Sequence, residues 1–130
     1  MKFDRKFAQF VCVGDTIKAD VTDKLQLVAT LVFDSDCDPQ NEGWYDEPDV
    51  ERWKNDEWHF VGVVLSVQSH DGTIKRNLGS LWGNEANLRD NNDHLTDVAN
   101  ELIDEREIVA ALREIYEPVT RAIKTLTHTA

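Results

Sequence analysis

Apolar and polar residues alternate along two segments near the N-terminus, at residues 10–21 and 25–33. The second segment is the more regular, since every other residue from Leu25 to Phe33 is apolar. A period of two is typical of a β-strand that buries one face. Because only the polar residues 22–24 separate the two segments, we predict an antiparallel hairpin.

The next part of the chain changes pattern twice. Residues 34–43 are polar and contain Pro39, Asn41 and Gly43, which predicts a loop. A short helix then fits residues 48–55, because proline suits the first turn of a helix and Asp46 or Glu47 precedes it as a cap.

The most hydrophobic stretch, residues 58–67, has apolar residues on both predicted faces and should be a central strand. His70-Asp71-Gly72 supplies a turn, after which residues 73–82 should pair back as a fourth strand. We expect Trp58 and Trp82 to lie in the core of this sheet.

The C-terminal part has apolar residues spaced by three and four, which predicts amphipathic helix. A polar loop at residues 84–92 should precede it, with Asn91 or Asn92 as the cap and a kink or break at Pro118. The apolar positions are Leu95, Val98, Ala99, Leu102, Ile103, Ile108, Leu112, Ile115, Val119, Ala122, Ile123 and Leu126. The sequence therefore predicts one α+β domain over residues 1–130: a four-stranded antiparallel sheet with a short inserted helix and C-terminal helices packed on one face.

Composition limits the setting of the protein. The chain has 130 residues and no apolar run long enough to span a membrane. We expect no secretory signal, because residues 1–10 are positively charged but no apolar stretch with a small-residue cleavage site follows. We expect a reducing cytoplasm, because the two cysteines, Cys12 and Cys37, form no disulfide framework. Cys12 lies in an apolar run and is predicted to be buried, whereas Cys37 lies among acidic residues that should suppress its reactivity.

The chain carries 25 acidic and 14 basic residues, a net charge of −11. Such a balance argues against direct binding to nucleic acid and against an anionic membrane surface. The excess lies in two segments: residues 34–58 hold ten acidic and two basic residues, and residues 93–130 hold eight and four. Three reasons for this charge remain: a basic protein groove as partner, a metal ion, or solubility alone.

Three motifs occur in order: W-K-N-D-E-W-H-F-V-G-V at residues 53–63, S-L-W-G-N-E at 80–85 and L-T-D-V-A-N-E-L at 95–102. Together they resemble a family of small uncharacterised proteins from bacteriophages and other mobile elements of proteobacteria. The resemblance covers residues 10–103 and departs from the family pattern at His94, where the family has tyrosine, and in residues 34–40, which lack its usual histidine. It implies a mobile-element setting in a bacterial cell rather than a particular mechanism.

Two acidic patterns are candidate sites. Asp34, Asp36, Asp38 and Glu42 resemble the oxygen ligands of a hard cation, but Pro39 and Tyr45 occupy the positions where an EF-hand needs Gly and Glu. A solvated acidic loop is the alternative. Asp93, Asp97, Glu101 and Glu105 recur every fourth residue and would form one stripe on a helix, either as an imitation of a phosphate backbone or as an ordinary solvated face.

Aromatic residues add a possible anchor. Trp44 lies beside Asp46 and Glu47 and either contacts a partner or packs under the loop. No nucleophile motif, phosphate loop or metal spacing is present, so we expect no enzyme and no cofactor. The first hypothesis is an acidic interaction protein that inhibits a host nucleic-acid-binding defence complex, such as an anti-CRISPR protein, by charge mimicry. The alternatives are an accessory protein of unknown role and a divalent-metal protein that uses residues 34–42.

Overall fold

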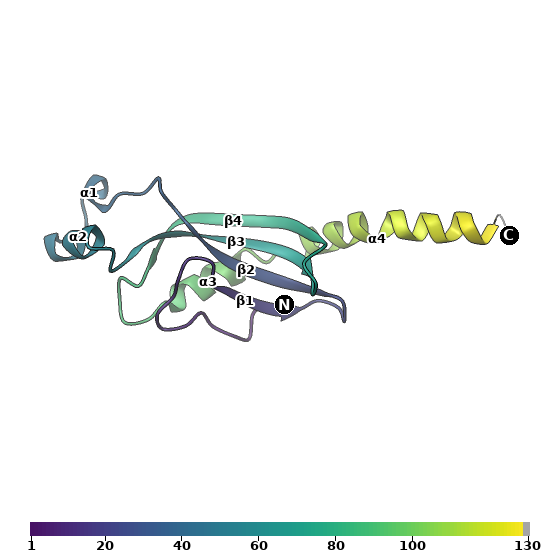
Figure 1. Ribbon diagram of the computed structural model, residues 1–130, viewed down its shortest axis with the longest axis horizontal. Coiled ribbons are helices and arrows are strands. Elements are labelled where there is room, and N and C mark those ends of the chain that lie inside the picture. The colour runs from purple at the N-terminus through teal and green to yellow at the C-terminus, as the bar shows by residue number, and fades with distance from the viewer. Residues whose placement is uncertain (129–130) are drawn as a thin grey trace.

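The computed structural model describes residues 1–128, which form an open sheet with helices over one face and at one end (Figure 1). The sheet has four antiparallel strands in the order β1-β2-β3-β4, which confirms the predicted α+β class. The strands are β1 (Thr16–Asp20), β2 (Leu25–Phe33), β3 (His59–Ser69) and β4 (Lys75–Ala86). The helices are α1 (Pro39–Glu42), α2 (Glu47–Lys54), α3 (Asp93–Glu101) and α4 (Glu105–His128).

The core follows from the alternation in the two central strands. Leu27 and Leu31 of β2 pair with Val67 and Val63 of β3, so their side chains share one face of the sheet. That face is covered by α3 and by the first half of α4, whose Ile108 is buried with them. Each fully buried aliphatic side chain contributes about 1.5–3 kcal/mol of transfer free energy. The alternating face of β2 is therefore buried from Leu25 to Leu31, whereas Phe33 at its end is exposed.

The N-terminal segment is not the strand that alternation predicted, since β1 begins only at Thr16. Residues 1–12 instead lie against the core with Phe3, Phe7 and Val11 buried. Side chains of the C-terminal half accept hydrogen bonds from this backbone: Asn100 from Phe3 at 2.7 Å, Thr96 from Phe7 at 3.0 Å and Asn87 from Val11 at 2.9 Å. Cys12, predicted to be buried, is exposed.

The C-terminal helix differs from the prediction in two ways. It is interrupted after α3, because Asp104 starts a new helix by accepting a hydrogen bond from the Arg106 backbone N–H at 2.9 Å. It then runs through Pro118 without ending. The second half of α4 projects beyond the sheet (Figure 1), so only its first half packs on the sheet face.

The other predicted boundaries need smaller corrections. The predicted loop at residues 34–43 contains the single turn α1, for which the Asp38 side chain is the cap. Strand β4 runs through Ala86, into the predicted loop. Asn92 occupies the cap position of α3, but its side chain bonds the Gln9 carbonyl and Asn87 instead.

Candidate partner-binding surface

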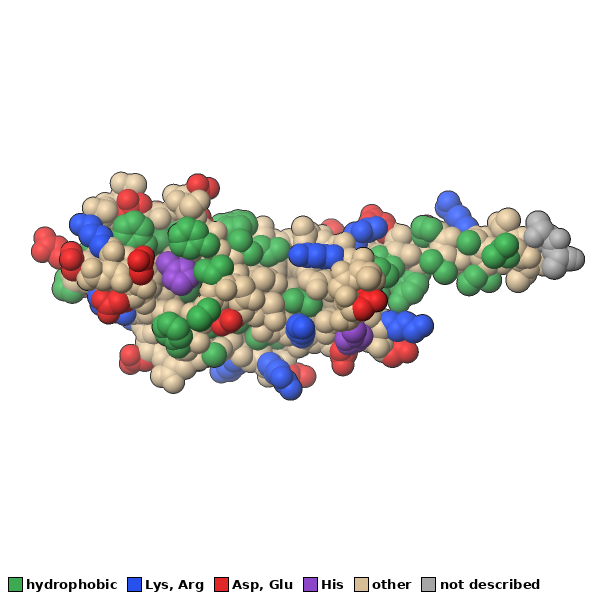
Figure 2. Space-filling view, viewed as in Figure 1, with side chains coloured by type: hydrophobic (Ala, Val, Ile, Leu, Met, Phe, Trp, Pro, Cys, Tyr) green, Lys and Arg blue, Asp and Glu red, His purple; other side chains and the backbone are tan. Residues whose placement is uncertain are grey.

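The first acidic segment gathers at one end of the molecule. Residues 34–51 contain eight acidic residues and no basic one. They form α1, the start of α2 and the loops beside them, which lie beyond one end of the sheet (Figures 1 and 2). The acidic residues are Asp34, Asp36, Asp38, Glu42, Asp46, Glu47, Asp49 and Glu51. We call residues 34–51 the acidic end.

Asp34, one of the predicted partner-binding residues, points into the molecule and is only 6% exposed. Its Oδ2 accepts a hydrogen bond from the Gly83 backbone N–H at 2.8 Å, and its Oδ1 accepts one from the Asp36 N–H at 3.0 Å. These bonds fasten the loop after β2 to strand β4. Asp34 therefore fixes the position of the acidic end. Because its side chain is buried, only the exposed residues beside it are available for contact with a partner.

The thiol of Cys37 lies next to this carboxylate. Its Sγ donates to Asp34 Oδ2 across 3.5 Å. Burial first, and then the hydrogen bond and negative charge of Asp34, raise the pKa of Cys37 above its usual range. The thiolate is accordingly disfavoured, as the acidic surroundings in the sequence predicted.

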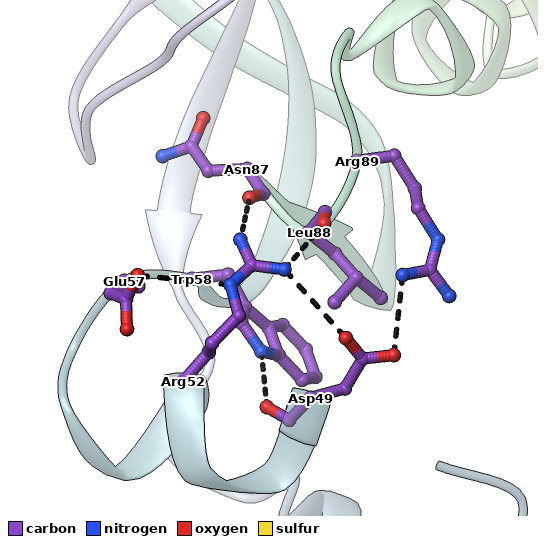
Figure 3. Close-up of polar contacts among 7 residues, drawn as sticks. All are labelled: Asp49, Arg52, Glu57, Trp58, Asn87, Leu88 and Arg89. Carbon is purple, nitrogen blue, oxygen red and sulfur yellow. Dashed lines mark hydrogen bonds and ion pairs between the residues drawn. The ribbon is translucent and has the colours of Figure 1, made fainter. Parts of the chain in front are cut away.

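Helix α2 is fastened to the loop that follows β4 by a group of polar contacts (Figure 3). The Arg52 guanidinium donates to the backbone carbonyls of Leu88 at 3.0 Å and Asn87 at 3.4 Å. Asp49 lies 3.6 Å from Arg52 and 3.2 Å from Arg89. This connection fixes α2, and with it the acidic end, relative to the sheet.

The acidic end packs on an aromatic cluster formed by Tyr45, Trp58 and Phe60. Trp58 is fully buried, as predicted, and packs against Phe60 with ring centroids 5.2 Å apart. Its indole N–H donates to the Asp49 carbonyl at 2.8 Å, which joins the cluster to α2. Tyr45 packs on the Trp58 ring at 5.4 Å. Burial first, then its hydrogen bond to Glu85, raises the pKa of Tyr45 to about 12.

Trp44 is different, since 70% of its surface is exposed. Its ring contacts that of Tyr45 at a centroid distance of 5.9 Å, while most of the indole faces solvent. Gly43, in the left-handed conformation at φ 81°, ends α1 directly before it. Trp44 therefore does not pack under the loop, and its contact with a partner stays a prediction.

A second exposed aromatic group, which the sequence did not reveal, borders the acidic end. Trp82 was predicted to be core but is 49% exposed, and Phe33 beside it in the same hollow is 54% exposed. The hollow is also lined by Asp36 and Cys37. In the structure, Trp82 and Gly83 form a β-bulge opposite Gly62, and Gly83 has a positive φ. The glycine that follows the bulky Trp82 was the feature of the sequence that could have indicated this bulge.

His59, at the start of β3, contacts the Phe33 ring with centroids 5.9 Å apart. Its Nε2 is buried without a hydrogen-bond partner among the described residues. Burial lowers the pKa of His59, while the charge of Asp56 opposes that shift. The imidazole is thus neutral at physiological pH and adds to the aromatic rather than to the charged character of this area.

The carboxylates around these aromatic residues are exposed and not neutralised. Within residues 1–128, no Lys or Arg forms an ion pair with Asp36, Glu42, Asp46 or Glu47. Asp38 is half-buried and serves as the cap of α1. Four predicted partner-binding carboxylates therefore share one end of the molecule with Trp44, and their fields add.

The predicted stripe of carboxylates on the C-terminal helix is divided. Asp93, Asp97 and Glu101 lie on α3, whereas Glu105 begins α4. The N-terminal segment supplies cations at both ends of the row: Lys6 lies 3.8 Å from Asp93, and the amino group of Met1 lies 3.1 Å from Glu105. Of the four carboxylates in this row, Asp97 and Glu101 have no ion pair in the described part of the chain.

The two acidic segments do not form one surface. Helix α3 covers the sheet face to which Val61 and Val63 point, and its Leu95 is buried with them. The acidic end packs instead over Trp58 and Phe60, which belong to a separate cluster. A partner that recognises accumulated negative charge would therefore meet the acidic end and α3 as separate sites.

Residues 1–128 contain no group of three or more His, Cys, Asp or Glu side chains placed to hold a metal ion. Asp34, Asp36, Asp38 and Glu42, the residues considered for a cation, thus do not converge as ligands. No helix in the same range is long and apolar enough to cross a membrane. No protein-family model matches the sequence, and no curated protein or solved structure is detectably similar to it.

Proposed function

We propose that the protein is a non-enzymatic interaction protein whose acidic end binds a basic surface on another protein. The observation on which the proposal depends is Trp44, a largely exposed indole between the short helices α1 and α2. The nearby carboxylates of Glu42, Asp46 and Glu47 form no ion pair with any residue of 1–128. Aromatic side chains provide much of the binding energy at interfaces, and charge of one sign speeds association with a partner of the opposite sign.

The negative charge of the acidic end indicates which class of partner it would bind. A surface that presents several carboxylates on a rigid support attracts the Lys- and Arg-rich grooves in which other proteins hold nucleic acid. The resemblance of residues 10–103 to mobile-element proteins suggests that such a groove belongs to a host nucleic-acid-binding defence complex, with an anti-CRISPR or similar inhibitor as the biological role. Binding would then compete with nucleic acid for the groove.

The proposal assigns different roles to the residues that were predicted to bind a partner. Asp36, Glu42, Asp46 and Glu47 supply charge, Trp44 supplies apolar contact, and Asp34 and Asp38 hold the loop. Asp97 and Glu101 form a separate and smaller patch on α3. Asp93 and Glu105 are assigned to the anchoring of the N-terminal segment, because both pair with it.

The test is affinity capture from a bacterial host lysate with two charge-reversed variants. The first is Asp36→Lys with Glu42→Lys and Glu47→Lys, and its matched control is Asp97→Lys with Glu101→Lys on α3. We expect the wild type and the control to retain a basic, nucleic-acid-binding protein at low salt and to release it at high salt or on addition of duplex DNA.

The acidic-end variant should retain none of that protein. Equal capture by the wild type and the acidic-end variant would contradict the proposal, and loss of capture only in the α3 variant would move the site to α3. Trp44→Ala should weaken binding of the captured partner about 30-fold, which corresponds to the roughly 2 kcal/mol expected of an aromatic anchor.

A further inference from the structure

An open hollow at the border of the acidic end combines two aromatic rings with two carboxylates. Trp82 of β4 and Phe33 of β2 line it, and about half of each side chain is exposed. Asp34 and Asp36, from the loop after β2, supply the charged part of the lining. The volume of the hollow is about 580 Å³, within the roughly 300–1,000 Å³ typical of small-molecule sites. It is therefore large enough to receive a side chain of another molecule.

The aromatic part of the lining is held in position. The indole N–H of Trp82 donates to Ser80 Oγ at 3.0 Å, and the ring packs on Gly62 of β3. The Phe33 ring is in contact with His59, with ring centroids 5.9 Å apart. Rings that are already ordered lose little conformational freedom when a ligand packs on them, so the hollow is pre-organised for binding.

Asp34 carries a negative charge that the structure does not neutralise. It is only 6% exposed, and its carboxylate accepts from the backbone N–H groups of Gly83 and Asp36 and from the thiol of Cys37. These donors satisfy its hydrogen bonds, but none of them is positively charged. Within residues 1–128, neither Asp34 nor Asp36 forms an ion pair, and no Lys or Arg lines the hollow. A buried carboxylate attracts a cation strongly, because little water remains to screen its charge.

Aromatic rings beside carboxylates are suited to one kind of cation in particular. The face of an aromatic ring attracts positive charge, and arginine makes such contacts more often than lysine. A guanidinium group is planar and weakly hydrated, so it can stack on a ring while its N–H groups donate to a carboxylate. A bare metal ion fits poorly, since no group of three or more His, Cys, Asp or Glu side chains is placed to hold one in residues 1–128.

An uncharged ligand is a poorer occupant of the same hollow. An apolar side chain could pack on Trp82 and Phe33, but it would remove Asp34 and Asp36 further from water without supplying a counter-charge. An anionic ligand would be repelled by the same two carboxylates. The charge of the lining therefore distinguishes among ligands that the aromatic rings alone would accept.

We propose that this hollow is a binding site for an arginine side chain of the basic partner. The guanidinium stacks on Trp82 and pairs with Asp36, and the buried charge of Asp34 adds to the attraction. The inference rests on the proposed function only for the source of the arginine, since the site itself is defined by the residues that line it. Together with Trp44, the hollow would give the partner two separate contacts and a preference for Arg over Lys at one of them.

The experiment is an NMR titration of the ¹⁵N-labelled full chain with N-acetyl-arginine amide at low salt. The reporters are the indole N–H of Trp82, assigned by its absence in Trp82→Phe, and the backbone N–H of Gly83, which donates to Asp34. We expect both signals to shift saturably, with a dissociation constant on the order of millimolar for a single side chain. N-acetyl-citrulline amide, which has nearly the same shape without the charge, should bind at least tenfold more weakly.

Two matched pairs of variants locate the site. Trp82→Ala should weaken arginine binding about tenfold, as loss of a partly desolvated cation–π contact does, whereas Trp44→Ala should leave it unchanged. Asp36→Asn should weaken it severalfold, whereas Glu47→Gln, which removes the same charge outside the hollow, should have a smaller effect. Because the Asp36 side chain is exposed, its neutral variant should fold like the wild type.

Several outcomes would overturn the inference. They are equal affinity for the arginine and citrulline amides, tighter binding of N-acetyl-lysine amide, or no shift of either reporter at tens of millimolar ligand. Capture from lysate tests the proposed function separately. A hollow that binds no arginine, in a protein that still captures a basic partner through the acidic end, would contradict this inference alone. Arginine binding without any such capture would support the site and contradict the proposed function.

Discussion

The indole of Trp82 lies directly on Gly62 of the neighbouring strand, in the place that a side chain at residue 62 would occupy. A Cβ built on Gly62 would be 2.3 Å from Trp82 Cε3, far inside van der Waals contact. The ring is held there by a hydrogen bond from its Nε1 to Ser80 Oγ at 3.0 Å. Gly62 therefore determines how Trp82 is presented at the border of the acidic end.

Gly62→Ala should push the Trp82 ring away from the sheet and destabilise the protein by about 1–3 kcal/mol, as overpacking does. The measurement is chemical denaturation together with tryptophan fluorescence, which should shift to the red as the indole gains exposure. Gly79→Ala on β4 is the matched control, because its Cβ would meet only Leu102 at an ordinary 3.6 Å.

The control should be neutral or slightly stabilising, since alanine restricts the unfolded chain. Adding Trp82→Ala to Gly62→Ala should recover stability relative to the sum of the two single changes. Additive effects of the two substitutions would show that the ring and the glycine are not in contact.

A second prediction concerns Asp34. Asp34→Asn should destabilise the fold by about 1–3 kcal/mol, because an amide cannot accept from Gly83 and Asp36 as a carboxylate does. It should also remove the negative charge and the acceptor that help to raise the pKa of Cys37, although burial, the largest cause, would remain. Alkylation of Cys37 should then become faster near neutral pH.

The pH–rate profile of alkylation separates these effects. A midpoint shifted to lower pH in Asp34→Asn indicates a lowered thiol pKa, whereas a uniformly higher rate indicates only a loosened loop. Cys12, which is exposed, serves as the internal reference in both proteins. An unchanged midpoint would contradict the role assigned to the Asp34 charge.

The regular elements were predictable because their signals are local. Alternation in Leu25 to Phe33 and spacing of three and four after Leu95 each require only neighbouring residues. The break between α3 and α4 was also visible, in principle, as Asp104 followed three residues later by Glu107, a pattern typical of a helix start. In the structure the Asp104 side chain caps α4 by accepting from the Arg106 backbone N–H. The break considered at Pro118 does not occur, because α4 continues through the proline to His128.

The arrangement of the site was harder to predict from the sequence than the helices and strands were. The burial of Asp34 depends on Gly83, and the anchoring of α2 depends on carbonyls of residues 87 and 88, in each case more than 30 residues away along the chain. Likewise, the cations that pair with Asp93 and Glu105 come from the N-terminal segment. Charge counts locate a candidate region, but only long-range contacts decide which carboxylates remain exposed and without a counter-ion.

A third prediction uses the pKa of Tyr45, which is raised from 10 to about 12 by burial and by Glu85. The folded state holds this proton more tightly than the unfolded state, so its contribution to stability is present below pH 10 and is lost as the pH rises toward 12. Spectrophotometric titration should show one tyrosine ionising near pH 12, and that transition should be absent in Tyr45→Phe. Ionisation of Tyr45 near pH 10 would contradict the packing described.

The last prediction compares the two arginines that contact Asp49. Arg52 donates to two backbone carbonyls in the loop directly after β4 and forms ion pairs with Asp49 and Glu57, and its side chain is about one-third exposed (Figure 3). Among residues 1–128, Asp49 is the one ion-pair partner of Arg89, whose side chain is mostly exposed. Arg52→Ala should therefore cost about 1–3 kcal/mol, because two carbonyls lose their donor, while Arg89→Ala should cost less than about 1 kcal/mol.

Chemical denaturation at low and high salt measures both effects. Added salt screens the exposed pair, so the cost of Arg89→Ala should shrink further, whereas hydrogen bonds from Arg52 to neutral carbonyls should persist. Arg52→Lys is the sharper variant, since it keeps the charge but cannot reach both carbonyls with a planar fork. If Arg52→Lys were as stable as wild type, charge rather than directed hydrogen bonding would hold α2, and the acidic end would be less rigidly placed than the contacts indicate.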